Sequence, residues 1–184
     1  MDVLQPFSPN LFLCAPRLEK LEISVRRDIP RQPIAITDGD KLPLHTLRLA
    51  NCSLSWSSLN LSGLKSLVLY DVRSPSPPNM VEFLAVLSSM QNFTVLHLKD
   101  VLPSSRGFLF SGGLDNSPKI HLPRLAFLAV IEQLSTVVAL LSCINIPSEA
   151  QLTLEPLLER GSSIEDYAPI SSFLAQRFRI SEQL

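Results

Sequence analysis

Histidines, and the acidic residues near them, are the side chains of this 184-residue chain that could do chemistry. The histidines are His45, His97 and His121, and His97 lies three residues before Asp100. A histidine beside a carboxylate can act as a general base, so His97 and Asp100 are the candidate pair of a small hydrolase-like catalytic domain. None of the histidines has a paired nucleophile nearby in the sequence. The nucleophile-elbow, zinc-protease, P-loop and dinucleotide-glycine motifs are missing. We therefore expect that the chain is not an enzyme, with catalysis through His97 as the alternative.

The cysteines and the charges argue against other kinds of site and partner. Cys14, Cys52 and Cys143 lack the C-x-x-C spacing of a zinc site and the even number of a disulfide framework. We expect no metal, no cofactor and a reducing compartment, the cytoplasm or the nucleus. Sixteen Lys and Arg against seventeen Asp and Glu give a net charge of −1 without a basic stripe, so nucleic acid is not an expected partner. No apolar run reaches the length of a membrane helix, so no membrane partner is expected either.

The leucines follow a repeated spacing that predicts the elements of the fold. The stretch "LPLHTLRLANCSL" (42–54) contains the pattern L-x-x-L-x-L-x-x-C-x-L, which is typical of leucine-rich repeats. The same frame returns in "LEKLEISV", "LKSLVLYDV", "FTVLHLKDV" and "LAFLAVIEQL", and more weakly in "EAQLTLEPL". The x-L-x-L-x centre of each copy predicts a short strand with its leucines in the core. We expect an α/β leucine-rich-repeat solenoid of about five to six irregular repeats, a single domain over residues 1–184. Parallel strands would form its concave side, and helices or loops its convex side.

Cys52 occupies the ninth position of its copy, where the chain turns away from the strand. A small side chain at this position can satisfy buried backbone groups, and cysteine fits as a weak donor. We therefore assign Cys52 a structural role in a buried turn. The equivalent residues Val72 and Val101 exclude a polar ladder along all copies.

The connections between the copies contain helical patterns. Apolar spacing predicts a helix over about residues 79–90, and a second from an N-cap at Ser135 to Ile144. A third predicted helix has one apolar face, formed by Ile170, Phe173, Leu174 and Phe178. Residues 26–43 and 102–123 are predicted to be loops, with "FLF" (108–110) tucked against the core.

The residues between the leucines point to the solvent-facing side of each predicted strand. In the middle copies they form an apolar and aromatic patch with two cations, the mixture found at protein interfaces. A covering loop, such as 102–118, is the alternative. The candidate partner-binding residues are Arg48, Val68, Tyr70, Val95, His97, Lys99, Phe127 and Ile131.

A row of polar residues follows the strands, two positions after each second core leucine. It consists of Asn51, Asp71, Asp100 and Glu132. Turn chemistry is the interpretation that we favour, because Asn and Asp often begin turns. An acidic rim that attracts basic partners is the alternative.

Several phrases resemble a known family. "APRLEKLEI", "LPLHTLRLANCSL", "NMVEFLAVLSSMQNFTVLHLKDVLP" and "HLPRLAFLAV" are similar to the leucine-rich portion of F-box-like proteins of mushroom-forming fungi, over roughly residues 10–180. The resemblance implies a substrate-receptor subunit of a cullin-type ubiquitin ligase, with a protein substrate as its partner. Such proteins carry an F-box before the repeats, and this sequence does not include one. No residue can therefore be assigned to the ligase adaptor. Both ends of the repeat pattern also look unfinished, because a solenoid needs polar caps over its terminal repeats, so we expect a fragment without terminal caps or a product shorter than its relatives. A truncated remnant without function is a further alternative.

Overall fold

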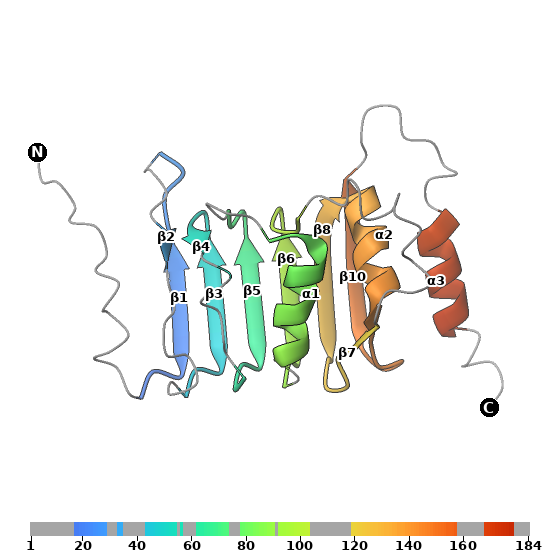
Figure 1. Cartoon of the computed structure of the whole chain (residues 1–184), viewed down its shortest axis with the longest axis horizontal. Helices are drawn as coiled ribbons and strands as arrows, with labels where there is room; N and C mark the ends of the chain where they lie inside the picture. The colour runs from blue at the N-terminus through green and yellow to red at the C-terminus, as the bar shows by residue number, and fades with distance from the viewer. Residues whose placement is uncertain are drawn as a thin grey trace, which may run out of the picture.

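The central element of the structure, a computed structural model, is a parallel sheet of six strands (Figure 1). The structure describes residues 17–28, 33–34, 43–54, 56, 62–73, 78–90, 92–103, 119–157 and 168–178. Because this parallel sheet is combined with helices, the protein is of the α/β class. The strands lie side by side in the order in which they occur along the chain: β1 (Lys20–Ser24), β3 (Thr46–Ala50), β5 (Ser66–Tyr70), β6 (Val95–Lys99), β8 (Phe127–Gln133) and β10 (Gln151–Leu157).

The register of this sheet places equivalent residues of the leucine pattern side by side. One row runs through Leu47, Leu67, Leu96 and Leu128, and these four side chains have no exposed surface. The row continues into Leu21 of β1 and Leu152 of β10, which are only partly buried. A second row, two residues later on each strand, repeats this distribution of burial. The core is thus complete under the four central strands and thinner under the two edge strands.

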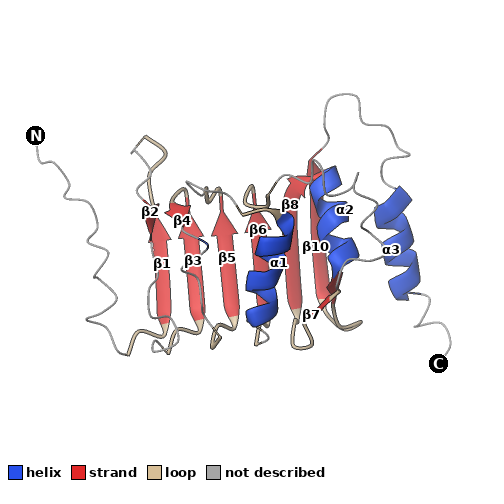
Figure 2. Ribbon diagram, in the orientation of Figure 1, coloured by secondary structure: helices blue, strands red, loops and turns tan. Residues whose placement is uncertain are grey.

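Two helices cover the part of the leucine face that β6, β8 and β10 form (Figure 2). Helix α1 (Met80–Ser89) begins with a capping box, in which the Asn79 side chain accepts from the Glu82 amide and the Glu82 carboxylate accepts from the Asn79 amide. Its buried Phe83 packs edge-on against the ring of Trp56, with centroids 5.2 Å apart. This helix confirms the one predicted over residues 79–90.

Helix α2 (Leu134–Cys143) confirms the second predicted helix but corrects both of its ends. Strand β8 is seven residues long and leads directly into the helix, so the N-cap is Gln133 and not Ser135. The helix ends at Cys143 because Ile144 already belongs to a strand. Helix α2 contacts β8, β10 and helix α3 (Ala168–Phe178).

Helix α3 confirms the third predicted helix. Its Ile170 is buried and Leu174 is partly buried against the core. The side chains of Phe173 and Phe178 lie outside the described residues.

Two segments predicted to be loops each contribute a short strand. Strand β2 (Pro33–Ile34) pairs with β4 (Ser53–Leu54), and β7 (Ile120–His121) pairs with β9 (Ile144–Asn145). Two-residue strands carry too little periodicity to be recognised in a sequence. The predicted contact of residues 108–110 with the core lies outside the described residues. Within the described ranges, no helix has both the length and the apolar character needed to cross a lipid bilayer.

Truncating a central leucine tests the observed register. Leu67→Ala should lower the free energy of unfolding by about 2–5 kcal/mol, because it removes a completely buried side chain from the middle of a row. Val81→Ala is the matched control, since Val81 lies on α1 with 61% of its surface exposed and should cost less than about 0.5 kcal/mol. Urea denaturation of both variants measures the difference. Equal losses would contradict the assignment of Leu67 to the core.

Candidate functional site

The candidate site lies on the face of the sheet opposite the leucine rows, which we call the open face. It is formed by the strand residues that alternate with the leucines. Each of the eight predicted partner-binding residues is on this face and is half-buried or exposed, whereas the neighbouring leucines are buried. Residues 104–118, most of the loop predicted as an alternative cover, lie outside the described residues. Whether the open face binds a partner stays a prediction.

Four of the predicted residues form a continuous row of ring and cation contacts across four strands. The guanidinium carbon of Arg48 lies 5.4 Å from the ring centroid of Tyr70. The ring of Tyr70 meets His97 edge-on at 4.8 Å, and His97 meets Phe127 edge-on at 6.4 Å. Both geometries are favourable for aromatic side chains, and the Arg48 contact has the spacing of a cation–π pair. The row is therefore a preformed cluster rather than four separate side chains.

The register explains why these particular residues meet. Arg48 is directly opposite Val68, and Tyr70 is directly opposite Lys99. The contacts therefore run diagonally, with an offset of two residues between neighbouring strands, a distance that only long or aromatic side chains bridge. The other predicted residues, Val68, Val95, Lys99 and Ile131, occupy the remaining positions beside the row. Aligning the six copies reveals the shared face, but the diagonal pairing depends on side-chain rotamers that an alignment does not contain.

His97 is the polar centre of the row. Its Nδ1 lies 3.0 Å from the Tyr70 hydroxyl, within hydrogen-bond distance. Its Nε2 is buried and has no hydrogen-bond partner among the described residues. Burial of the ring is the largest cause that lowers the pKa of His97 below 6.5; Arg48 and Lys99 add to it, and Glu155 opposes it. His97 is therefore neutral at neutral pH, and its ring is engaged by Tyr70.

The histidines do not form a catalytic arrangement with the predicted carboxylate. Among the described residues, His97 makes no hydrogen bond to Asp100, which follows β6 in a turn with a φ of 50°. His121 lies on a separate small sheet, where its Nδ1 is 3.2 Å from the side-chain nitrogen of Asn145. The described part of the chain also contains no group of three or more His, Cys, Asp or Glu residues that could hold a metal ion. The structure thus brings aromatic and cationic groups together, and not an acid–base pair.

The polar row after the strands is turn chemistry at three of its four positions. Asn51, Asp71 and Asp100 have φ angles of 54°, 47° and 50°, a left-handed conformation that Asn and Asp tolerate better than most residues. Their amides donate to carbonyls of the next strand, Asn51 to Tyr70 at 2.9 Å and Asp71 to Lys99 at 2.8 Å. These three turns direct the chain out of the sheet at the same position after β3, β5 and β6.

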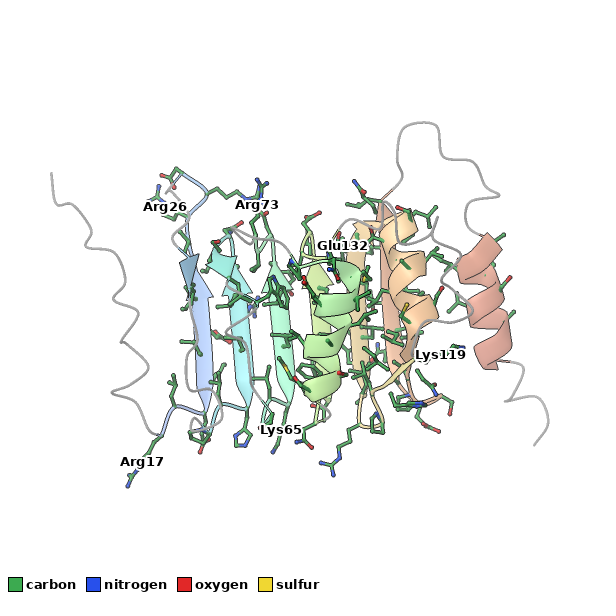
Figure 3. All side chains as sticks on the ribbon, in the orientation of Figure 1. Arg17, Arg26, Lys65, Arg73, Lys119 and Glu132 are labelled. Atoms are coloured by element: carbon green, nitrogen blue, oxygen red, sulfur yellow. The ribbon has the colours of Figure 1, made fainter. Side chains whose placement is uncertain are left out.

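Glu132 differs from the other three members of this row. It lies within β8 (Figure 3). Only 6% of its surface is exposed. Its Oε1 accepts hydrogen bonds from the amides of Val101 and Leu102, the latter at 2.8 Å. Burial raises the pKa of Glu132 above 4.5, opposed by these hydrogen bonds and increased by Asp100. For Glu132 both interpretations, turn chemistry and an acidic rim, are wrong, because its buried carboxylate accepts hydrogen bonds from the turn that follows β6.

Cys52 lies in the turn after β3 and has no exposed surface, as predicted for a structural turn residue. Its carbonyl accepts a hydrogen bond from the Arg73 amide at 3.0 Å.

Comparison of the chain with protein-family models found no match, and comparisons with curated proteins and with solved structures found none either.

Replacing Glu132 tests its role as a buried acceptor. Glu132→Ala should lower the free energy of unfolding by about 1–3 kcal/mol for each backbone amide left without an acceptor. Glu132→Gln should retain most of the stability, because the amide oxygen can accept the same hydrogen bonds. Urea denaturation at a series of pH values measures both effects.

The pH dependence has a definite sign. In the folded state Glu132 takes up a proton at higher pH than in the unfolded chain, so wild-type stability should rise relative to Glu132→Gln as the pH falls from 7 towards 4.5. A difference between the two proteins that does not vary with pH would contradict the buried assignment.

His97 should have the opposite effect on stability. Because its pKa is lowered by folding, the unfolded chain binds a proton first as the pH falls through 6.5, and the folded state loses stability. His97→Phe should remove this loss. Tyr70→Phe should retain the loss of stability at low pH, because burial of the ring, and not the contact with the Tyr70 hydroxyl, is the largest cause of the lowered His97 pKa. Parallel stability–pH curves for wild type and His97→Phe, measured by thermal melting, would refute the prediction.

Proposed function

We propose that the chain is a protein-recognition module built as a leucine-rich-repeat solenoid, with the open face as its concave binding side. The proposal is supported by six parallel strands in sequence order, by the matching leucine positions, and by the helices on the opposite face. Connections of unequal length are compatible with irregular repeats. A recognition module of this kind displays the side chains of several adjacent strands to one partner.

The observation that carries the proposal is the contact row Arg48–Tyr70–His97–Phe127. Tyrosine and arginine are enriched among the residues that dominate binding energy, and such residues gather at the centre of an interface. Here they stand on the four strands whose leucines are completely buried. The ring contacts and the Tyr70–His97 hydrogen bond hold the side chains before a partner arrives, which lowers the entropy lost on binding.

The family resemblance suggests a more specific role. We propose that the module resembles the substrate-binding part of an F-box subunit of a cullin-type ubiquitin ligase, acting in the cytoplasm or nucleus. Its partner would be a protein, with no nucleic acid or membrane involved. Contact with a ligase adaptor is proposed only if an F-box is encoded upstream of these residues, and none of the residues is assigned to it.

Catalysis through His97 has less support than recognition. A general base needs a ring nitrogen that can reach a substrate proton. The Nδ1 of His97 faces the Tyr70 hydroxyl and its Nε2 is buried. The geometry therefore favours His97 as a member of a contact surface.

Substitutions in the contact row test the proposed function. Tyr70→Ala and Phe127→Ala should each weaken partner capture by about tenfold or more, as loss of a central interface residue does. Both side chains are half-buried on the open face, so circular dichroism should still show a folded protein. Proximity labelling of wild type and variants in cells measures capture.

The control belongs on the exposed side of α1, away from the open face. Val81→Ala is preferable to Glu82→Ala, because Glu82 closes the capping box of α1, and to Gln91→Ala, because Gln91 lies outside the described residues. Val81→Ala should leave capture unchanged. If Val81→Ala abolished capture and the Tyr70 and Phe127 variants retained it, the open face would not be the binding surface.

A further inference from the structure

The charges on the open face are unevenly distributed. On the four central strands, this face carries the two cations Arg48 and Lys99 and no carboxylate, although the whole chain has a net charge of −1. The acidic residues of the face are confined to the edge strands, where Glu22 is on β1 and Glu155 is on β10. The centre of the open face is thus a positive region on a protein of nearly balanced charge.

Neither central cation is neutralised within the described part of the chain. The Glu22 carboxylate, which is nearest to Arg48 in the register, pairs with Lys20 at 3.0 Å. Arg48 contacts the Tyr70 ring instead of a carboxylate, and the described residues provide no ion pair to Lys99. Both side chains are exposed. Two such cations beside the rings of Tyr70 and His97 are complementary to an acidic partner.

The spacing of the cations limits the shape of that partner. Arg48 is on β3 and Lys99 is on β6, two strands away. The residue of β6 that is level with Arg48 is His97, and Lys99 lies two residues beyond it. With about 4.8 Å between strands and 3.3 Å per residue, their Cα atoms are separated by roughly 12 Å. An extended peptide covers this distance in three to four residues.

We propose that the open face binds an acidic polypeptide segment in extended conformation. Two Asp or Glu side chains four residues apart would pair with Arg48 and Lys99, because only side chains an even number of residues apart face the same side of an extended segment. An apolar or aromatic side chain midway between them would rest on the rings of Tyr70 and His97. This inference rests on the proposed function and adds the chemical class of the partner to it.

Selection from a random library of displayed peptides, about ten residues long, tests the inference with the whole chain as bait. We expect the enriched peptides to carry paired acidic residues at the stated spacing. Arg48→Gln combined with Lys99→Gln should weaken binding of a selected peptide at least tenfold. Replacing the acidic residues of that peptide by Asn or Gln should have the same effect, and added salt should weaken binding to the wild type.

The matched control removes two positive charges elsewhere. Arg26 follows β1 and Lys65 precedes β5 (Figure 3). Arg26 pairs with Asp28 at 3.1 Å. Arg26→Gln combined with Lys65→Gln should leave peptide binding unchanged. An equal loss in the control would show that only net charge matters and would overturn the inference.

The remaining outcomes separate this inference from the proposed function. Enriched peptides without acidic residues, whose binding is lost in Tyr70→Ala but not in the Arg48 and Lys99 variant, would overturn the acidic partner and leave the recognition face intact. Enrichment of nothing beyond the bait-free control, or of peptides insensitive to Tyr70→Ala and Phe127→Ala, would overturn both.

Discussion

The parallel register of the six-stranded sheet is the constraint on which the rest of the structure depends. Hydrogen bonding between neighbouring strands sets Leu47, Leu67 and Leu96 side by side, so the apolar positions of every copy must be in phase. A slip of one residue would move an entire set of side chains to the wrong face. The same constraint therefore determines the composition of both faces. Because two apolar residues of each strand point into the core, the residues that alternate with them lie on the open face, where Tyr70 and His97 come within hydrogen-bond distance.

The ends of the strands show how the pattern is continued from one copy to the next. At Asn51, Asp71 and Asp100 a left-handed residue turns the chain away from the sheet, and its amide bonds to the next strand. The pattern changes at β8, which extends to Gln133 and enters α2 directly. The turn before it still has backbone amides that need an acceptor, and the buried carboxylate of Glu132 accepts from two of them. A side chain thus replaces a backbone partner at the one place in this row where the strand does not turn.

The sequence allowed the strands to be predicted far better than the contacts between them. The L-x-x-L-x-L frame identifies all six long strands and the inward leucines, because that periodicity comes directly from alternation along a strand. The start of α2 at Leu134 could not be predicted, since Ser135 looks like a good N-cap and the extra length of β8 leaves no local signal. Glu132 was misassigned because a position in the frame does not reveal burial. On the candidate site, the shared face was predictable, and the diagonal ring contacts were not, because they depend on rotamers and twist.

The burial of the sheet also bears on where recognition can be strongest. Leu21 and Leu152 on the edge strands are only partly buried, whereas the leucines beneath Arg48, Tyr70, His97 and Phe127 are completely enclosed. Side chains on a tightly packed support lose less freedom on binding than those on a loosely packed edge. The aromatic row and the two central cations therefore coincide with the most firmly supported part of the sheet. A partner that binds there gains contacts with groups already held in place. The negative charges of Glu22 and Glu155 on the edge strands would repel an acidic segment that binds away from the centre.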